Sequence, residues 1–507
     1  MVASSRCVLG EVAAVSGVFR LLLLFGFACL LHTVQAVASQ VPRSPVAEIK
    51  SDARLEAAAA AIDEGRYSDA LKTIASAQSG STLSGRDADW AAYLMSRALA
   101  ANGNPADAEK TIRERQRAYP NAYNWASLVS ILMSCGKQEE AAKAILEIAD
   151  GEFVLVNRLR HGVIENILVS LEAGPAGLRD DLVTKLIEGR YTGPASQHTP
   201  DTIRLRYINL LLRQNRVEGA VRETLLVESP TVLSILLTDK SFSPIWDYPA
   251  IRALLEPGAL SARVDRGIQA RLEQPILLSS DWLELMRSLR VVGRADEAVR
   301  LGLNALEQAR HDKRAASPAL RLEIANAYAD MGESWAARRT ARELQKEQSS
   351  LPVGLRVSIA HLLEVTGDDE GAIMMLNTLE GVVSLPLAQK VLACAAHDLD
   401  RRERRDAAVA QLELMADEAV VELMDAYVCV GQAEKAKAVL ISMYSTPELR
   451  TSAILTSQLY AASPKAGTDL SDLRYRMRAL VASHEVQDAI KAYARTLGLP
   501  FTNVNSR

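Results

Sequence analysis

The sequence predicts an all-α protein in which helix–turn–helix units repeat and stack into an α-solenoid. A short string that runs from a Gly to an Ala five residues later recurs along the chain, and helix-type apolar periodicity precedes and follows it. Of the 507 residues, 49% are hydrophobic but only 5% are aromatic, which suits a large core of helices packed through Ala and Leu. One helical pair cannot bury its apolar faces alone, whereas stacked pairs can.

The first 38 residues are expected to be a secretory signal peptide. Arg20 precedes an apolar run from Leu21 to Leu31, and Ala36-Val37-Ala38 has the small-x-small pattern of a cleavage site. His32 interrupts the run before the ~20 apolar residues that a membrane span requires. We therefore expect cleavage after Ala38, export, and no stable membrane span in the mature chain; a retained anchor and a later start codon remain alternatives.

Charge and cysteine usage restrict the functional classes. Loss of Arg6, Arg20 and Glu11 with the leader changes the net charge from −4 to −5, so the mature chain has no broad cationic field for nucleic acid or anionic lipid. Three cysteines remain, and they are odd in number and far apart in sequence. We expect no disulfide and interpret each as a small buried hydrophobic residue; they are Cys135, Cys394 and Cys429.

The recurrent string is interpreted as the turn inside each unit. Gly permits the positive φ that ends a first helix, the acidic residues that follow suit the start of a second helix, and the Ala lets the two helices approach closely. The anchors are Gly65, Gly103, Gly136, Asn215, Gly293, Gly332, Gly367 and Gly431. Their spacing implies a period of about 37 residues. Units without a clear anchor are expected near 158–190, 237–256 and 386–416.

This pattern resembles the tetratricopeptide repeat family. Trp125 and Trp282 lie eleven positions before the Gly, where that family places a large residue, and Tyr328 and Tyr427 match its aromatic position four before the Gly. The resemblance covers most of residues 52–450. It implies a right-handed α-solenoid of tetratricopeptide-like helix–turn–helix repeats.

The array is expected to consist of two blocks. Residues 239–255, with Phe242, Pro244 and Pro249, look like the acidic-x-x-Phe-x-Pro-Leu segment that follows repeat blocks in some bacterial tetratricopeptide proteins, and the two prolines are expected to start short helices. The expected organisation is a linker at 39–51, an N-terminal repeat block at 52–236, an inter-block segment at 237–260, a C-terminal repeat block at 261–462, and C-terminal capping helices with a tail at 463–507.

We expect no enzyme, no cofactor and no metal site. The zinc-protease, nucleophile-elbow, Walker and dinucleotide motifs are absent from the sequence, and the seven His residues never pair at ligand spacing. Adjacent carboxylates such as Asp180 and Asp181 fall at expected helix starts, where the helix dipole explains them. The basic run 401–405 falls at an expected turn, where a solvated surface explains it.

The candidate partner-binding residues come from the family resemblance. In tetratricopeptide arrays the first helix of each unit lines a concave groove, and the resemblance implies exposed side chains at set positions before the Gly. Large aromatic residues beside Arg are typical peptide anchors. The candidates are Trp90, Tyr93, Arg97, Tyr123, Ser130, Arg287, Arg290, Asn326 and His361, and the same transfer also marks Met133, Leu322 and Glu364. The family's peptide-carboxylate clamp is not carried over, because Asn326 alone fits it.

These inferences predict a non-catalytic protein–protein interaction scaffold of the bacterial periplasm or envelope, with a protein segment as its partner. Two alternatives stay open. An organellar RNA-binding pentatricopeptide-like protein is suggested by residues 124–141, but the net charge of −5 and units of uneven length disfavour it. The other is an accessory subunit that positions an envelope enzyme.

Overall fold

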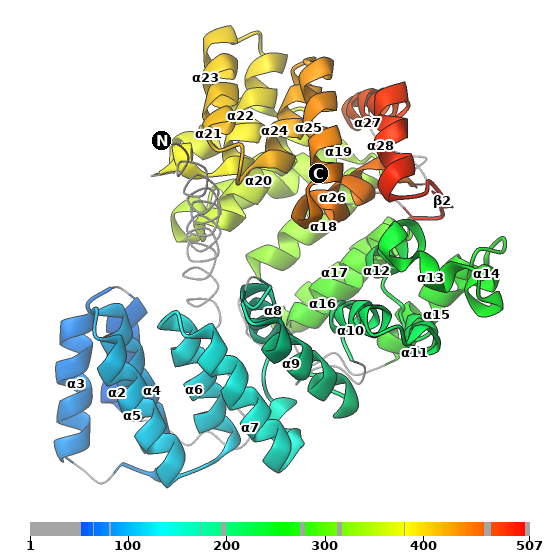
Figure 1. Ribbon diagram of the computed structural model, residues 1–507. Coiled ribbons are helices and arrows are strands. Elements are labelled where there is room, and N and C mark those ends of the chain that lie inside the picture. Colours follow the sequence, from blue (N-terminus) through cyan, green and yellow to red (C-terminus); the bar gives the residue numbers. More distant parts are fainter. Residues whose placement is uncertain are drawn as a thin grey trace, which may run out of the picture. The chain divides into compact units, whose positions relative to one another are not determined.

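The computed structural model describes residues 52–63, 65–80, 83–172, 174–193, 199–273, 279–311, 317–379, 381–460 and 468–501. The predicted signal peptide at 1–38 and linker at 39–51 lie outside these residues. The described chain is an array of helices, which confirms the all-α prediction (Figure 1). It divides into two compact units between Leu210 and Leu211, inside helix α10 (Asp201–Arg213) and before the predicted inter-block segment at 237–260.

The N-terminal unit, up to Leu210, has its own apolar core, which includes Leu55, Leu94 and Leu132. Its helices before α10 are α2 (Ala53–Asp63), α3 (Tyr67–Gly80), α4 (Gly85–Ala101), α5 (Pro105–Ala118), α6 (Ala122–Ser134), α7 (Gln138–Val156), α8 (His161–Ser170) and α9 (Ala176–Glu188).

The C-terminal unit, from Leu211, has a second core, which includes Leu363, Leu412 and Leu440. Its helices are α11 (Val217–Thr224), α12 (Pro230–Thr238), η1 (Lys240–Phe242), α13 (Ser243–Trp246), α14 (Pro249–Leu254), α15 (Ala259–Leu272), α16 (Ser279–Val291), α17 (Ala295–His311), α18 (Pro318–Asp330), α19 (Ser334–Gln345), η2 (Gln348–Ser350), α20 (Val353–Val365), α21 (Asp369–Asn377), η3 (Val382–Ser384), α22 (Pro386–Asp398), α23 (Arg402–Leu414), α24 (Val420–Cys429), α25 (Ala433–Ser445), α26 (Pro447–Ser457), α27 (Thr468–Val481) and α28 (His484–Tyr493). Its two strands, β1 (Leu459–Tyr460) and β2 (Gly498–Leu499), pair in parallel, with Leu459 opposite Gly498.

The predicted Gly anchors are the turns that end the helices. Gly136 has a φ of 71° and Gly293 a φ of 78°, the left-handed conformation that Gly adopts without a steric cost. The amide of the next residue then bonds back to the carbonyl five positions before it, as in Lys137 N–H to Leu132 O at 2.8 Å. These turns confirm the helix–turn–helix interpretation of the repeated string.

Two units without a Gly at the left-handed position use the same turn. Asp400, with a φ of 52°, separates α22 from α23, and Arg190, with a φ of 54°, ends α9. The amides of Arg401 and Tyr191 make the matching hydrogen bonds, at 2.7 and 2.8 Å. The sequence predicted units in these regions but placed no anchor, because Arg rarely adopts the left-handed conformation and Asp adopts it far less often than Gly.

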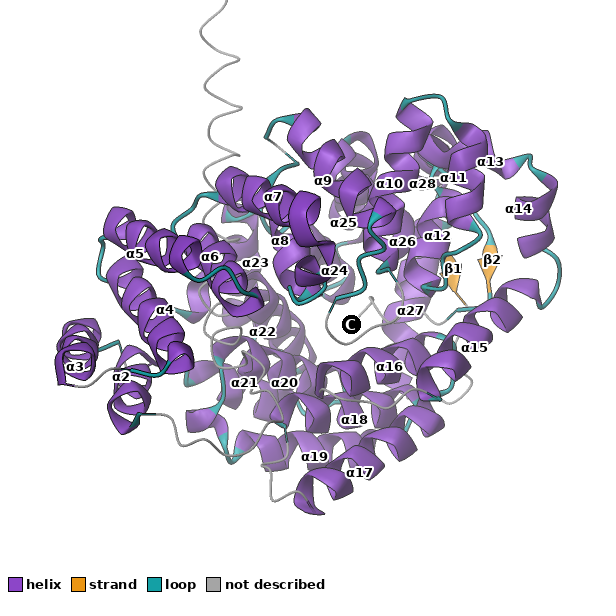
Figure 2. Cartoon of the chain, turned by 90° about the horizontal axis from the view of Figure 1, so that it is seen from below, coloured by secondary structure: helices purple, strands orange, loops and turns teal. Residues whose placement is uncertain are grey.

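Within each unit, the first helices of successive repeats form a layer. In the N-terminal unit α2 packs against α4 and α4 against α6, and in the C-terminal unit α16, α18, α20, α22 and α24 contact one another in order (Figure 2). The Ala five residues after each anchor is fully buried between paired helices, as at Ala141 and Ala298. Side chains one repeat apart in sequence therefore become neighbours in this layer.

The segment around 239–255 forms short helices, as predicted. Pro244 lies in the first turn of α13 and Pro249 begins α14, and both positions suit a residue without a backbone N–H. Asp239 ends α12, and its side chain accepts a hydrogen bond from the Ser241 amide at 2.8 Å. Near the C-terminus, α27 and α28 pack on α24 and α25.

Candidate partner-binding surfaces

In the N-terminal unit, two of the candidate aromatic residues lie together. The rings of Tyr93 on α4 and Tyr123 on α6 meet edge to face, with centroids 6.3 Å apart and an interplanar angle of 79°. Tyr93 is 6% exposed, so the expectation that its side chain is exposed is wrong: it packs between consecutive first helices. Tyr123 keeps partial exposure, and burial raises the pKa of its hydroxyl.

A buried carboxylate fixes this pair of helices. Asp89 on α4 accepts hydrogen bonds from Arg115 Nε at 2.6 Å and from the side-chain amides of Asn121 and Asn124, each at 3.0 Å. Asn121 also caps α6, because its side chain accepts from the Asn124 amide at 2.9 Å. One acidic group therefore joins α4, α5 and the start of α6, next to Tyr123 in the sequence.

The other candidates of this unit flank the tyrosine pair. Trp90 lies one turn before Tyr93 on α4 and is half-buried against the core, and Arg97 lies one turn after it with partial exposure. Ser130 is half-buried on α6. Trp90, Arg97 and Tyr123 are thus the candidates here that combine a large side chain with accessible surface.

In the C-terminal unit, Arg290 is enclosed by carboxylates. Its guanidinium contacts Asp330 Oδ2 at 2.5 Å and also pairs with Glu323, and all three residues are buried. Burial acts to lower the pKa of Arg290, but the two carboxylates outweigh it and raise that pKa. The expected exposure of Arg290 is therefore wrong, because partners on α18, one repeat later, cover it.

The neighbouring candidates differ in exposure. Arg287 is 65% exposed and reaches Glu323 Oε2 at 3.4 Å, so this side chain stays available at the surface. Asn326 is half-buried on α18, the helix that carries Glu323.

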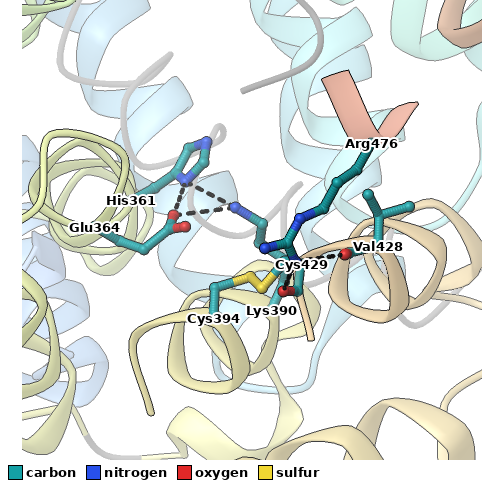
Figure 3. Close-up of a disulfide and its surroundings, with 7 residues drawn as sticks. All are labelled: His361, Glu364, Lys390, Cys394, Val428, Cys429 and Arg476. Atoms are coloured by element: carbon teal, nitrogen blue, oxygen red, sulfur yellow. Dashed lines mark hydrogen bonds and ion pairs between the residues drawn. A yellow bond between two sulfur atoms is a disulfide. The ribbon is translucent and has the colours of Figure 1, made fainter. Parts of the chain in front are cut away.

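His361 belongs to a buried cluster with charged neighbours (Figure 3). Glu364 Oε2 lies 3.0 Å from both His361 Nδ1 and Lys390 Nζ, and Lys390 is only 3% exposed. Burial acts to raise the pKa of Glu364, but the Lys390 ammonium and the His361 hydrogen bond lower it to about 2. His361 is itself 8% exposed, so its predicted exposure is also wrong.

The next first helix adds a second carboxylate. Asp425 on α24 is half-buried and lies within electrostatic reach of Lys390. Burial raises the pKa of Asp425 to about 7, although Lys390 opposes the shift. Sequence reasoning missed Lys390 and Asp425. Lys390 lies ten positions before the turn at Asp400, and Asp425 lies six positions before Gly431. Both are positions at which the family resemblance implies a groove side chain.

The expectation for two of the cysteines is wrong. Cys394 on α22 and Cys429 on α24 form a disulfide with a Cα–Cα distance of 5.7 Å. Their sequence separation of 35 is about one repeat, so consecutive first helices bring them side by side. Arg476 of α27 donates to the Cys429 carbonyl at 2.9 Å beside this bond (Figure 3). Cys135 is free and half-buried.

The described residues hold no group of three or more His, Cys, Asp or Glu side chains arranged to bind a metal ion. Among them, no helix is both long enough and apolar enough for a membrane crossing.

Comparison with known proteins finds similar solved structures but no matching family. No family model matches the chain, and no curated protein matches it. Among solved structures it is similar to the APC/C hetero-tetramer Cut9–Hcn1, at 13% identity, a TM-score of 0.28, and coverage of 86% of this chain and 94% of that one. It is also similar to the maize pentatricopeptide repeat protein PPR10, at 11% identity and a TM-score of 0.29, with coverage of 79% of this chain and 64% of that one. For PPR10 in complex with an 18-nt psaJ RNA element, the identity is 14%, the TM-score is 0.26, and the coverage is 86% of this chain and 70% of that one.

The helices, turns and packing described above define an α-solenoid of tetratricopeptide-like helix–turn–helix repeats.

Proposed function

We propose that the protein is an exported, non-catalytic scaffold of the bacterial periplasm or envelope that binds a protein segment along its first-helix layer. The observation that carries the proposal is the surface on α4 and α6. There, half-buried Trp90 and Tyr123 lie on consecutive first helices, and partly exposed Arg97 lies on the same helix as Trp90. Rigid aromatic side chains with a neighbouring Arg are the residue types that most often anchor protein partners.

The disulfide supports export. A bond between Cys394 and Cys429 persists in oxidising compartments such as the periplasm and is rare in the cytosol. The apolar run and Ala-x-Ala ending of residues 1–38 support the same route. N-terminal sequencing of the secreted protein tests it: we expect a mature chain that begins at Ser39, and a chain found in the cytosol with its leader intact contradicts export.

The binding surface is tested by crosslinking in the native compartment. Replacement of Trp90 and Tyr123 together by Ala is expected to reduce the yield of crosslinked partner at least several-fold, because both anchors are lost. Trp335 on α19 is 68% exposed and lies outside the first-helix layer, so Trp335→Ala is the matched control and should leave the yield unchanged. If the double variant keeps its helical content and gives the same crosslinking yield as the wild type, the proposed surface is contradicted.

RNA binding is the second candidate function, because residues 124–141 resemble a pentatricopeptide unit. A filter-binding assay decides between the two. A scaffold for protein segments with a net charge of −5 should not retain RNA at moderate salt. Retention that falls steeply with salt and disappears in the Arg97→Ala variant favours the RNA-binding alternative.

A further inference from the structure

The two ends of the C-terminal unit are joined to each other. Near the start of the unit α12 packs against α26, and Asp239 forms an antiparallel bridge with Ala494 (Figure 1). The side-chain contacts that accompany this bridge link residues 251 and 258 positions apart. A linear repeat array has no such contact, because each of its units touches only its neighbours.

Arg495 makes the central contact of this junction. Its backbone amide donates to the Thr238 carbonyl at 2.9 Å, and its Nε donates to the Leu237 carbonyl at 2.6 Å. Both carbonyls lie at the end of α12, where the last carbonyls lack helical partners and the helix dipole favours a cation. The guanidinium also stacks 3.8 Å from the centroid of the Trp246 ring, whose Nε1 donates to Leu236 O at 2.9 Å.

A reciprocal contact runs in the other direction. Lys240, two residues after α12, donates its ammonium to the carbonyl of Lys491 in the last turn of α28. Each of these two helices is therefore capped at its C-terminal end by a cation from the opposite end of the unit.

The chain after α28 is also tied down. Gln458, which directly precedes β1, donates to the Arg495 carbonyl at 3.3 Å and accepts from the Leu497 amide at 3.2 Å. Strands β1 and β2 then pair, and Phe501 is fully buried just after them (Figure 2). The segment is thus held by both the start and the end of the array.

We propose that residues 484–499 act as a clasp that closes the C-terminal unit on itself, so that its two ends are stable only together. In an open solenoid the terminal helices fray independently. Here the C-terminal ends of α12 and α28 are capped by each other's neighbouring residues, Arg495 and Lys240. Loss of either helix therefore exposes the last carbonyls of the other. The first helices from α16 to α24 lie between these joined ends, and the clasp therefore fixes the curvature that they present to a partner.

Hydrogen exchange of the full-length chain tests this coupling. Arg495→Ala removes the stacked guanidinium and its carbonyl bond. We expect amides in α12 and in α28 to exchange faster by roughly tenfold or more, as for the loss of a charged hydrogen bond, while α18 to α21 keep their protection. Unchanged exchange in α12 overturns the proposal.

Two further variants guard against general damage. Arg495→Lys keeps a cation, so the chain retains its fold. Amide exchange in α12 and α28 should then rise together, but less than in Arg495→Ala. Faster exchange in α28 alone overturns the coupling. Arg252→Ala removes an exposed ion pair with Asp247 in the same region, at 2.8 Å, and should leave both helices unchanged.

A crosslink tests the closure itself. Residues 239 and 494 face each other in the antiparallel bridge, where side chains are close enough for a disulfide. The Asp239→Cys, Ala494→Cys double variant should form an intramolecular bond under mild oxidation and give a monomer of altered mobility on a non-reducing gel; either single variant should not. Absence of the bond, or a crosslinked dimer, contradicts an intramolecular clasp.

Discussion

Cys394 and Cys429 are 35 residues apart in sequence, and their Cα atoms are 5.7 Å apart in space, because one helical repeat separates them. The same relationship governs the polar contacts of the C-terminal unit. Lys390 reaches Glu364 from the next first helix, and Arg290 reaches Glu323 in the same way. In these three examples, contacts between consecutive first helices join residues that lie 26 to 35 positions apart in sequence.

The disulfide is expected to stabilise the end of the array. Reduction, or replacement of Cys394 and Cys429 by Ser, should lower the free energy of unfolding by about 4 kcal/mol, because the bond closes a loop of 35 residues. Thermal unfolding with and without a dithiol measures the effect. Cys135→Ser is the control and should change little. Equal midpoints for the oxidised and reduced protein contradict the prediction.

The pair of Lys390 and Glu364 is expected to depend on both partners. Lys390→Met leaves a buried carboxylate without its cation and should destabilise the protein by about 3–5 kcal/mol. Adding Glu364→Leu removes that carboxylate and should recover most of the loss. Denaturant unfolding of the single and double variants gives the coupling energy. A double variant as unstable as the sum of its single variants shows that the charges act independently.

Glu364 also predicts sensitivity to acid. Its pKa is lowered from 4.5 to about 2 in the folded protein, so its ionised form stabilises the fold above pH 4.5, and this stability is lost as the pH falls toward 2. In Glu364→Gln that part of the pH dependence should disappear. Unfolding midpoints measured between pH 2 and 5 test it, and parallel curves for the two proteins refute it.

Asp425 predicts the opposite pH dependence. Its pKa is raised from 3.8 to about 7, so between these values the folded state holds a proton that the unfolded state has lost, and stability falls as the pH rises. Asp425→Asn should remove this fall and raise stability at pH 8 by on the order of 2 kcal/mol. Asp417, exposed before α24, provides the control variant Asp417→Asn. A wild-type-like slope in Asp425→Asn refutes the assignment.

The helices were predictable because their signals are local. A Gly at a left-handed turn, an Ala where two helices touch and a Pro in a first turn each act within a few residues, as Gly136, Ala141 and Pro249 show. The turn at Asp400 was not predicted, since Asp adopts the left-handed conformation more often than most residues but far less often than Gly.

The candidate surface was predictable only in part. Exposure at Arg290 and His361 was inferred from one repeat at a time, whereas both are covered by side chains of the following repeat. The disulfide and the contact of Lys390 with Glu364 were missed for the same reason, because each joins side chains from two consecutive repeats. The residue types within one unit do not predict which side chains of the next unit will pack against them.

Two glycines provide a matched test of the helix packing in the C-terminal unit. At Gly302 on α17 an added Cβ would lie 2.5 Å from Ile324 Cγ1 and 2.8 Å from Met286 Cε, so Gly302→Ala should destabilise by about 1–3 kcal/mol through overpacking between α16, α17 and α18. At Gly354 on α20 the added Cβ meets no atom within 4 Å, so Gly354→Ala should be neutral or slightly stabilising, since Ala favours the helix. Thermal unfolding midpoints separate the two variants. A stable Gly302→Ala protein would show that α17 does not pack as closely against α16 and α18 as these distances require.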